Sequence, residues 1–165
     1  MGKGSRVRGV SVEEGYTFIE LIIVAAILAI LASVAIPLVQ VTSQRQREVE
    51  LRRELRQMRD AIDKFKDAVD SGAIAQTELK PDNEGYPPDL ETLVEGVPAA
   101  GDATGRKIRF GLRRIPIDPM TNTTDWGMRS FQDKPDSTSW GRQNVFDVYT
   151  KSEATALDGT KYKDW

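Results

Sequence analysis

The side chains able to do chemistry in this chain are mainly carboxylates, because its 165 residues include no histidine and no cysteine. The imidazole base of a catalytic triad is therefore missing, as are the thiol nucleophile and the common zinc and copper ligands. The 25 Asp and Glu residues show no spacing that singles out an acid–base pair. We therefore expect no enzyme. Any metal site would use oxygen ligands, which favours calcium or magnesium.

One carboxylate stands out by its position. Glu20 immediately precedes an uncharged run from Leu21 to Gln44, whose apolar part is interrupted only by Ser33 and Pro37. About 20 apolar residues can cross a bilayer as a helix. A carboxylate at the edge of such a helix costs about 3 kcal/mol unless it is paired, so it usually marks function.

Basic residues precede the apolar run. Lys3, Arg6 and Arg8 place the N-terminus in the cytoplasm by the positive-inside rule, so the rest of the chain would lie outside the membrane. A secretory signal peptide would have a shorter apolar core followed by a small-residue cleavage site. A plain single-span anchor fits the length of the run but gives Glu20 no role.

The segment Gly15-Tyr16-Thr17-Phe18-Ile19-Glu20 resembles the leader junction of type IV prepilins and type II secretion pseudopilins. The resemblance implies that a prepilin peptidase cuts after Gly15 on the cytoplasmic side and removes residues 1–15. It also implies N-methylation of Tyr16, an aromatic residue where these families usually have phenylalanine. The apolar helix would stay on the mature chain, and Pro37 falls where these families often carry a helix-kinking proline.

The proposed cut gives Glu20 a partner. It creates an α-amino group at Tyr16, which is cationic at neutral pH and lies one helical turn from Glu20. The resemblance implies that Glu20 meets the Tyr16 amine of a neighbouring subunit in a filament and so sets the axial register. An unpaired charge would be costly at low dielectric. The apolar helices would exchange lipid contacts for one another and form the filament core.

A second helical pattern follows the uncharged run. Between Arg45 and Ser71 charges are dense, but apolar residues recur at spacings of four, three, four, three and four, at Leu51, Leu55, Met58, Ile62, Phe65 and Val69. No Gly or Pro lies between Pro37 and Ser71, so we expect one helix from Tyr16 to about Ser71. The stripe could be a coiled-coil seam, but with only three heptads we expect it to pack on this chain's own C-terminal domain.

The remaining segment is rich in Gly, Pro, Asp and Thr and contains only short periodic runs. Asp89 is a candidate N-cap for a short helix, and the stretches at 126–131 and 144–150 indicate short strands. We expect an α+β, pilin-like fold in which the long helix packs on a small antiparallel sheet with long loops. The expected organisation is a leader (1–15), a transmembrane and assembly helix (16–44), its amphipathic continuation (45–72) and a periplasmic α+β domain (73–165).

Four later tracts resemble the major pseudopilin of type II secretion: Gly85–Val94, Leu112–Pro119, Phe146–Thr150 and Asp164-Trp165. One departure is Met120-Thr121-Asn122, where that family commonly has a Trp-Gly-Asn turn. The resemblance implies a structural subunit of a pseudopilus that helps to drive protein export across the outer membrane. The alternative is a type IV pilus subunit; many of these carry a C-terminal disulfide loop, and this chain has no cysteine.

The same resemblance implies a location and partners. The subunit would be a single-pass protein of the bacterial inner membrane, with a cytoplasmic N-terminus and a periplasmic C-terminal domain. Its partners would be further copies of itself in a helical filament, minor pseudopilins, the prepilin peptidase, the inner-membrane assembly platform and, before assembly, membrane lipid. The net charge of −2 gives no reason to expect nucleic-acid binding.

The resemblance finally implies a calcium site, because the family's major pseudopilin binds calcium in its C-terminal loop. The matching stretch from Lys151 to Asp164 offers the carboxylates of Glu153, Asp158 and Asp164. Backbone carbonyls could complete the six to eight oxygens that calcium takes. Three lysines in the stretch oppose cation binding, and Asp158-Gly159 could instead form an ordinary turn.

Overall fold

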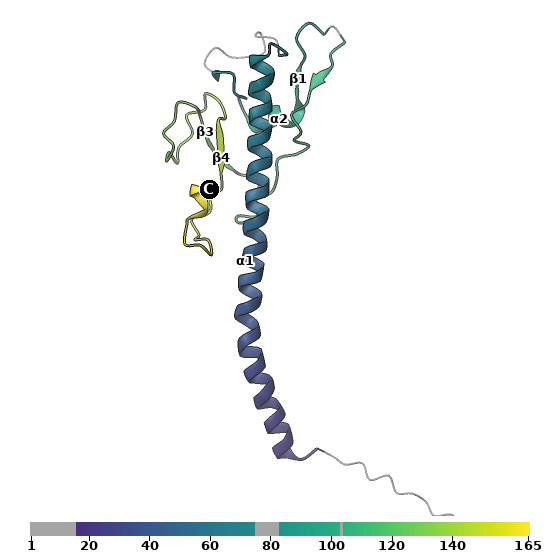
Figure 1. Ribbon diagram of the computed structural model, residues 1–165, viewed down its shortest axis with the longest axis vertical. Coiled ribbons are helices and arrows are strands. Elements are labelled where there is room, and N and C mark those ends of the chain that lie inside the picture. Colours follow the sequence, from purple (N-terminus) through teal and green to yellow (C-terminus); the bar gives the residue numbers. More distant parts are fainter. Residues whose placement is uncertain (1–15, 75–82, 103) are drawn as a thin grey trace, which may run out of the picture. The chain divides into compact units, whose positions relative to one another are not determined.

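The computed structural model describes residues 16–74, 83–102 and 104–165, and at 34–38 it describes the backbone alone. The elements are α1 (Phe18–Asp70), α2 (Leu90–Glu95), β1 (Val97–Pro98), β2 (Lys107–Ile108), β3 (Gly127–Arg129), β4 (Asp147–Tyr149) and a 3-10 turn, η3 (Tyr162–Asp164) (Figure 1). A long helix followed by small antiparallel sheets confirms the predicted α+β class. The chain divides into two compact units, Met1–Gln40 and Val41–Trp165.

The long helix α1 contains 53 residues, from Phe18 to Asp70. It ends one residue before the predicted end at about Ser71, and Gly72 follows. Gly72 has a φ of +71°, a conformation that glycine adopts without steric cost. Its N–H donates to the Val69 carbonyl at 2.9 Å, and the Ala73 N–H donates to the Ala68 carbonyl at 2.9 Å. These two bonds satisfy carbonyls that would otherwise have no partner at the helix end.

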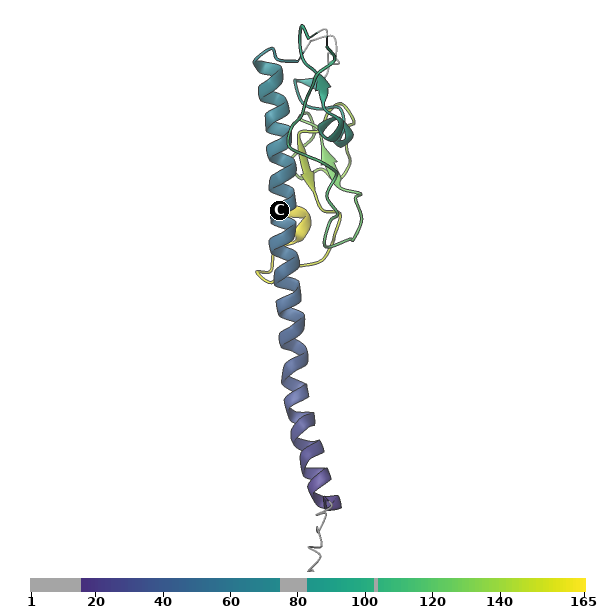
Figure 2. The same cartoon turned by 90° about the vertical axis from the view of Figure 1, so that its right-hand side faces the viewer.

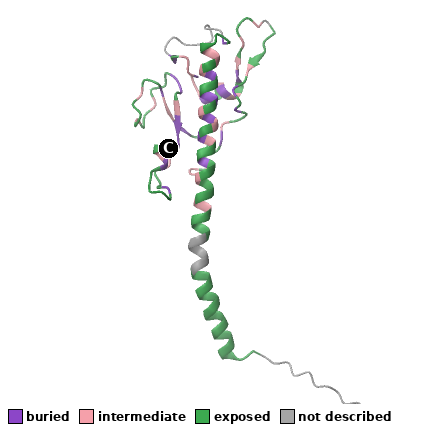
Figure 3. Ribbon diagram, viewed as in Figure 1, coloured by how far each residue is buried: buried purple, intermediate pink, exposed green. Residues whose placement is uncertain are grey.

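The predicted apolar stripe is the centre of the core. Leu51, Leu55, Met58, Ile62 and Phe65 are all buried, and they share one hydrophobic cluster with buried residues of the C-terminal segments. Buried residues therefore lie on the half of α1 beside those segments (Figures 2 and 3). Burying each such side chain stabilises the fold by about 2 kcal/mol. The prediction that the stripe packs on this chain's own C-terminal domain is confirmed.

Aromatic and aliphatic side chains from the loops complete this core. The Phe65 and Phe110 rings pack with centroids 5.0 Å apart. The buried Trp126 donates its indole N–H to the Pro116 carbonyl at 2.9 Å. A buried indole needs such a partner, so this bond fixes the proline-containing loop against the core.

Helix α2 begins at the N-cap that the sequence predicts. Asp89 is its N-cap, and the Asp89 carboxylate accepts from the Thr92 N–H at 2.8 Å. Gly96 ends the helix with a φ of +73°, and a Cβ there would collide with the Ile108 carbonyl oxygen. This close approach leads into the antiparallel pair β1–β2, where Val97 faces Ile108. This pair was not predicted from the sequence, because two-residue strands show no alternation.

The second pair, β3–β4, corresponds to the two predicted strands but is shorter. Gly127 faces Tyr149, Met128 faces Val148, and Arg129 faces Asp147. The chain leaves the ladder after Arg129 because side chains take over the backbone bonds. The Asp133 carboxylate accepts from the Ser130 N–H at 2.7 Å, and Asn144 Oδ1 accepts from the Phe131 N–H at 2.9 Å. In the described residues, the expected antiparallel pairing takes the form of two two-stranded sheets.

Candidate assembly site

The residues at the start of α1 form a capped helix N-terminus. The Glu20 N–H donates to Thr17 Oγ1 at 3.3 Å, and the Leu21 N–H donates to the Thr17 carbonyl at 3.1 Å. Thr17 therefore acts as N-cap, and Thr17-Phe18-Ile19-Glu20 has the Thr-x-x-Glu spacing of a capping box. Glu20 lies in the first helical turn. A carboxylate there interacts favourably with the helix dipole, by about 0.3–1 kcal/mol at an exposed position.

The helix that follows exposes apolar side chains on every side. All residues from Tyr16 to Ser33 are exposed, including Phe18 at 80% and Leu31 at 63%. The Ser33 hydroxyl, the polar interruption in this stretch, donates to the Ile30 carbonyl at 2.7 Å and so is satisfied within the helix. A helix that is apolar all round requires an apolar environment or partner helices. Glu20 is also exposed, and no ion pair joins it to another described residue.

Two predicted positions lie wholly or partly outside the described residues. Gly15, the predicted cleavage residue, lies outside the described residues. Pro37 lies within α1, but its side chain is outside the described part. Across the described stretches, no helix combines the length and apolar character needed to span a membrane.

Residues 11–36 match a protein family described as "Prokaryotic N-terminal methylation motif". The chain carries a type IV pilin-like signal. The matched residues include Gly15, Tyr16 and Glu20, so the capped helix start described above is part of this signal. The pilin-like signal indicates a subunit of the pilin and pseudopilin type, a structural class of protein. Neither a curated protein nor a solved structure matches the chain.

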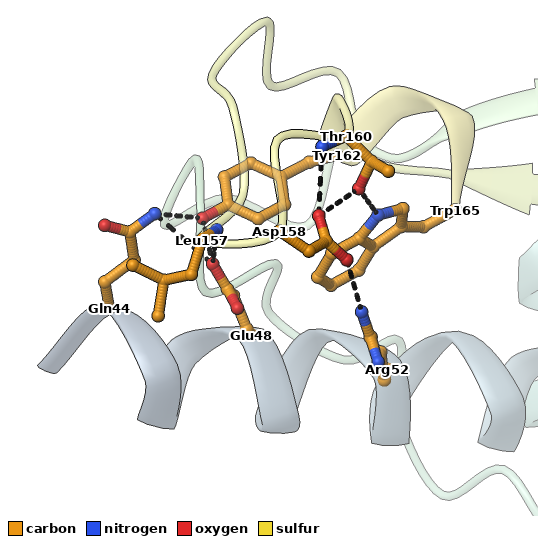
Figure 4. Close-up of polar contacts among 8 residues, drawn as sticks. All are labelled: Gln44, Glu48, Arg52, Leu157, Asp158, Thr160, Tyr162 and Trp165. Carbon is orange, nitrogen blue, oxygen red and sulfur yellow. Dashed lines mark hydrogen bonds and ion pairs between the residues drawn. The ribbon is translucent and has the colours of Figure 1, made fainter. Parts of the chain in front are cut away.

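In the C-terminal loop of this pilin-like chain, the Asp158 carboxylate lies between Thr160 and Arg52 (Figure 4). One Asp158 oxygen accepts from the Thr160 N–H and hydroxyl at 2.9 and 2.6 Å. The other lies 3.4 Å from the Arg52 guanidinium. The hydrogen bond from the Thr160 hydroxyl, with that from its N–H, lowers the pKa of Asp158. Asp158 and Gly159 form a turn.

The other two predicted calcium ligands, Glu153 and Asp164, take no part in the hydrogen bonds between Asp158 and Thr160. Glu153 pairs with the Lys163 amine at 3.3 Å, and Asp164 is exposed on η3. Among the described residues, no group of three or more acidic side chains converges in a way that could hold a metal ion. Of the predicted set of Glu153, Asp158 and Asp164, two members are paired with cations, Glu153 with Lys163 and Asp158 with Arg52.

A carboxylate on α1 holds the C-terminal loop instead. Glu48 Oε1 accepts from the Tyr162 hydroxyl at 2.8 Å and from the Leu157 N–H at 2.9 Å. Gln44 Nε2 donates to the Tyr162 hydroxyl at 2.9 Å and to the Thr155 carbonyl at 3.2 Å. Burial raises the pKa of Tyr162, and the nearby Glu48 carboxylate contributes in the same direction. The Tyr162 hydroxyl therefore remains a hydrogen-bond donor at neutral pH.

Two arginines extend this attachment along the same flank of α1. The Arg52 guanidinium lies 4.0 Å from the centroid of the Trp165 ring, and the Trp165 indole N–H donates to Thr160 Oγ1 at 2.7 Å. Arg59 donates to Asp147 Oδ1 at 2.8 Å and to the Trp165 backbone oxygen at 2.8 Å. We call the four helix residues Gln44, Glu48, Arg52 and Arg59 the loop anchor.

The loop anchor was missed in the sequence analysis, although a signal for it exists. Gln44 lies four positions before Glu48, and Glu48 lies three positions before Leu51. These spacings continue the apolar stripe toward the N-terminus with polar residues. Asp118 was also missed. It is fully buried, and its carboxylate accepts from the Met120 N–H at 2.8 Å and from the Thr121 and Thr150 hydroxyls. Its position between Pro116 and Pro119 is the sequence feature that could have singled out Asp118.

Proposed function

We propose that this chain is a structural, non-enzymatic subunit of a type II secretion pseudopilus, which helps to drive protein export across the outer membrane. The observation that carries the proposal is the pilin-like signal together with the capped, exposed apolar helix that follows it. In the proposal, the prepilin peptidase removes residues 1–15 by cutting after Gly15. Tyr16 then becomes the N-methylated first residue.

The exposed helix supports a membrane stage followed by assembly. Apolar surface left in water costs about 25 cal/mol per Å², so side chains such as Ile30 at 66% exposure and Leu31 at 63% require lipid or neighbouring helices. We place the subunit in the bacterial inner membrane as a single-pass protein, with its N-terminus in the cytoplasm and its C-terminal domain in the periplasm. Lipid covers the helix before assembly, and other copies cover it in the filament.

Glu20 supplies the register in this proposal. Its carboxylate has no ion-pair partner among the described residues, and the helix start holds it in the first turn. Pairing with the Tyr16 α-amine of the next subunit removes the cost of an unpaired charge in apolar surroundings. Pro37 is assigned to the same assembly helix.

The choice of secretion over a pilus depends on the C-terminal residues. The tracts at 85–94, 112–119 and 146–150 resemble the major pseudopilin, and the chain lacks the cysteines of many type IV pilins. A pseudopilus would also require minor pseudopilins and an inner-membrane assembly platform as partners. The alternative is a type IV pilus subunit that acts in adhesion, motility or a surface filament.

The test replaces Glu20 in the full chain, expressed with its own assembly machinery. Glu20→Ala and the near-isosteric Glu20→Gln should keep wild-type amounts in the membrane fraction but lose sheared filaments. Normal filament yield from both variants would refute the register role. Deleting the gene should leave secreted proteins in the periplasm if the filament serves secretion. Unchanged secretion with loss of surface filaments would favour the pilus.

A further inference from the structure

The face of α1 away from the core carries a second regular pattern. Seven exposed positions follow one another at spacings of four, four, three, four, three and four: Arg45, Val49, Arg53, Arg56, Asp60, Asp63 and Asp67. This spacing places them on one side of the helix, roughly 150° around its axis from the buried stripe at 100° per residue. We call these seven residues the charged stripe.

The charged stripe is segregated by sign. Its first half carries three arginines and its second half three aspartates, with Val49, 64% exposed, among the arginines. In the described part of the chain, none of these six charges forms an ion pair. The arginines that hold the C-terminal segments, Arg52 and Arg59, are different residues on the neighbouring flank.

An ordinary solvated helix face mixes the two signs. Opposite charges three or four residues apart stabilise a helix, whereas like charges at these spacings destabilise it. The charged stripe places Arg53 beside Arg56, and Asp63 lies within one turn of both Asp60 and Asp67. Like charges thus adjoin within each half, whereas Arg56 and Asp60, where the halves meet, are opposite charges four residues apart. A surface of complementary charge would relieve the repulsion within each half.

We propose that the charged stripe is a contact between copies of this chain, in which the aspartates of one copy face the arginines of the next. The centres of the two halves lie 12 positions apart, so two parallel helices would be displaced by about 18 Å along their axes. The two halves are different surfaces, so this head-to-tail contact does not close on itself and can continue along a filament. The parallel orientation rests on the proposed function, in which all copies enter one membrane from the same side.

A charge swap tests the complementarity. Arg53→Asp with Arg56→Asp, or Asp60→Arg with Asp63→Arg, should each lower filament yield about tenfold, because like charges then face each other. Exchanging all six charges of the stripe restores opposite charges between copies and should return the yield to near wild type. Equal membrane levels and leader cleavage serve as controls. Wild-type yield from the one-sided variants, or no recovery in the swap, would overturn the proposal.

Cross-linking tests the register independently. Because the chain contains no cysteine, introduced thiols have no background. Val49→Cys with Asp60→Cys, 11 positions apart, should give a ladder of disulfide-linked oligomers in the full chain, and neither substitution alone should do so. An antiparallel, closed pair would instead place the middle of the stripe opposite itself, so a strong dimer from Arg56→Cys alone would overturn the proposal.

Failure of this contact can be told apart from failure of the proposed function. If wild type forms no filaments, or Glu20→Ala leaves them intact, the proposed function fails. If Glu20→Ala abolishes filaments while the stripe variants assemble normally and no ladder forms, only the charged stripe contact fails.

Discussion

The Tyr162 hydroxyl donates to Glu48 Oε1 at 2.8 Å, although the two residues are 114 positions apart in the chain. This bond closes the C-terminal loop onto α1, and the Leu157 N–H shares the same oxygen. A buried tyrosine hydroxyl that loses its acceptor bears a desolvation cost. The loop is therefore attached through a side-chain carboxylate of the helix.

Replacing this carboxylate should loosen the loop. We expect Glu48→Ala to lower the free energy of unfolding by about 1–3 kcal/mol, because a charge-assisted bond to Tyr162 and a backbone bond are lost together. Thermal unfolding of the full chain in detergent measures the change. Glu50→Ala is the matched control, because Glu50 is exposed and forms no ion pair among the described residues. Equal effects from both variants would contradict the anchoring role.

Acid should weaken the same loop through Asp158. Hydrogen bonds from Thr160 hold its pKa below the ordinary value of about 3.9. A carboxyl whose pKa falls on folding stabilises the folded state above its unfolded pKa, and this contribution is lost as the pH falls through the folded pKa. We therefore expect Asp158→Asn to flatten the stability–pH curve below about pH 4. Asp164→Asn removes a carboxylate at an exposed position of the same loop and serves as the comparison variant.

Calcium should not stabilise the chain. Glu153 and Asp158 already pair with Lys163 and Arg52, so a cation would have to displace these partners. The unfolding temperature should be the same in millimolar calcium and in excess chelator. An upward shift with calcium that Asp158→Asn removes would show that the loop rearranges into a metal site.

Removal of the leader, residues 1–15, changes the mass of the chain and can be measured directly. Intact-mass measurement of the membrane form should give a chain that begins at Tyr16 and carries one added methyl group. Gly15→Val should leave residues 1–15 attached, because the cleavage site is then blocked by a branched side chain. A mature form that begins elsewhere, or normal cleavage of Gly15→Val, would contradict the proposed junction.

Helical periodicity made the main features predictable. The buried stripe at Leu51 and its successors, the Asp89 cap and the stop after Asp70 were all visible in the sequence, because each depends on residues within one or two turns. The pilin-like signal was equally local. Both strands of the β3–β4 pair were also anticipated, from the stretches at 126–131 and 144–150.

The remaining features depend on residues that are far apart in the chain. The contacts of Glu48 with Tyr162 and of Asp118 with Thr150 join segments whose pairing no local pattern encodes. The β1–β2 pair was missed because it contains two residues a side. The carboxylates predicted as calcium ligands were judged by type and spacing, whereas the cations that occupy two of them, Arg52 and Lys163, became evident only from the fold.

The loop anchor also has a mechanical meaning. A pull transmitted along α1 at Gln44 would reach Tyr162 through one hydrogen bond of 2.9 Å, although the two residues are 118 positions apart in the chain. Glu48, Arg52 and Arg59 act beside it, so the four attachments would share the tension in shear. The last turn of the chain would therefore move as one rigid piece with the helix when a subunit is pushed or drawn along its axis.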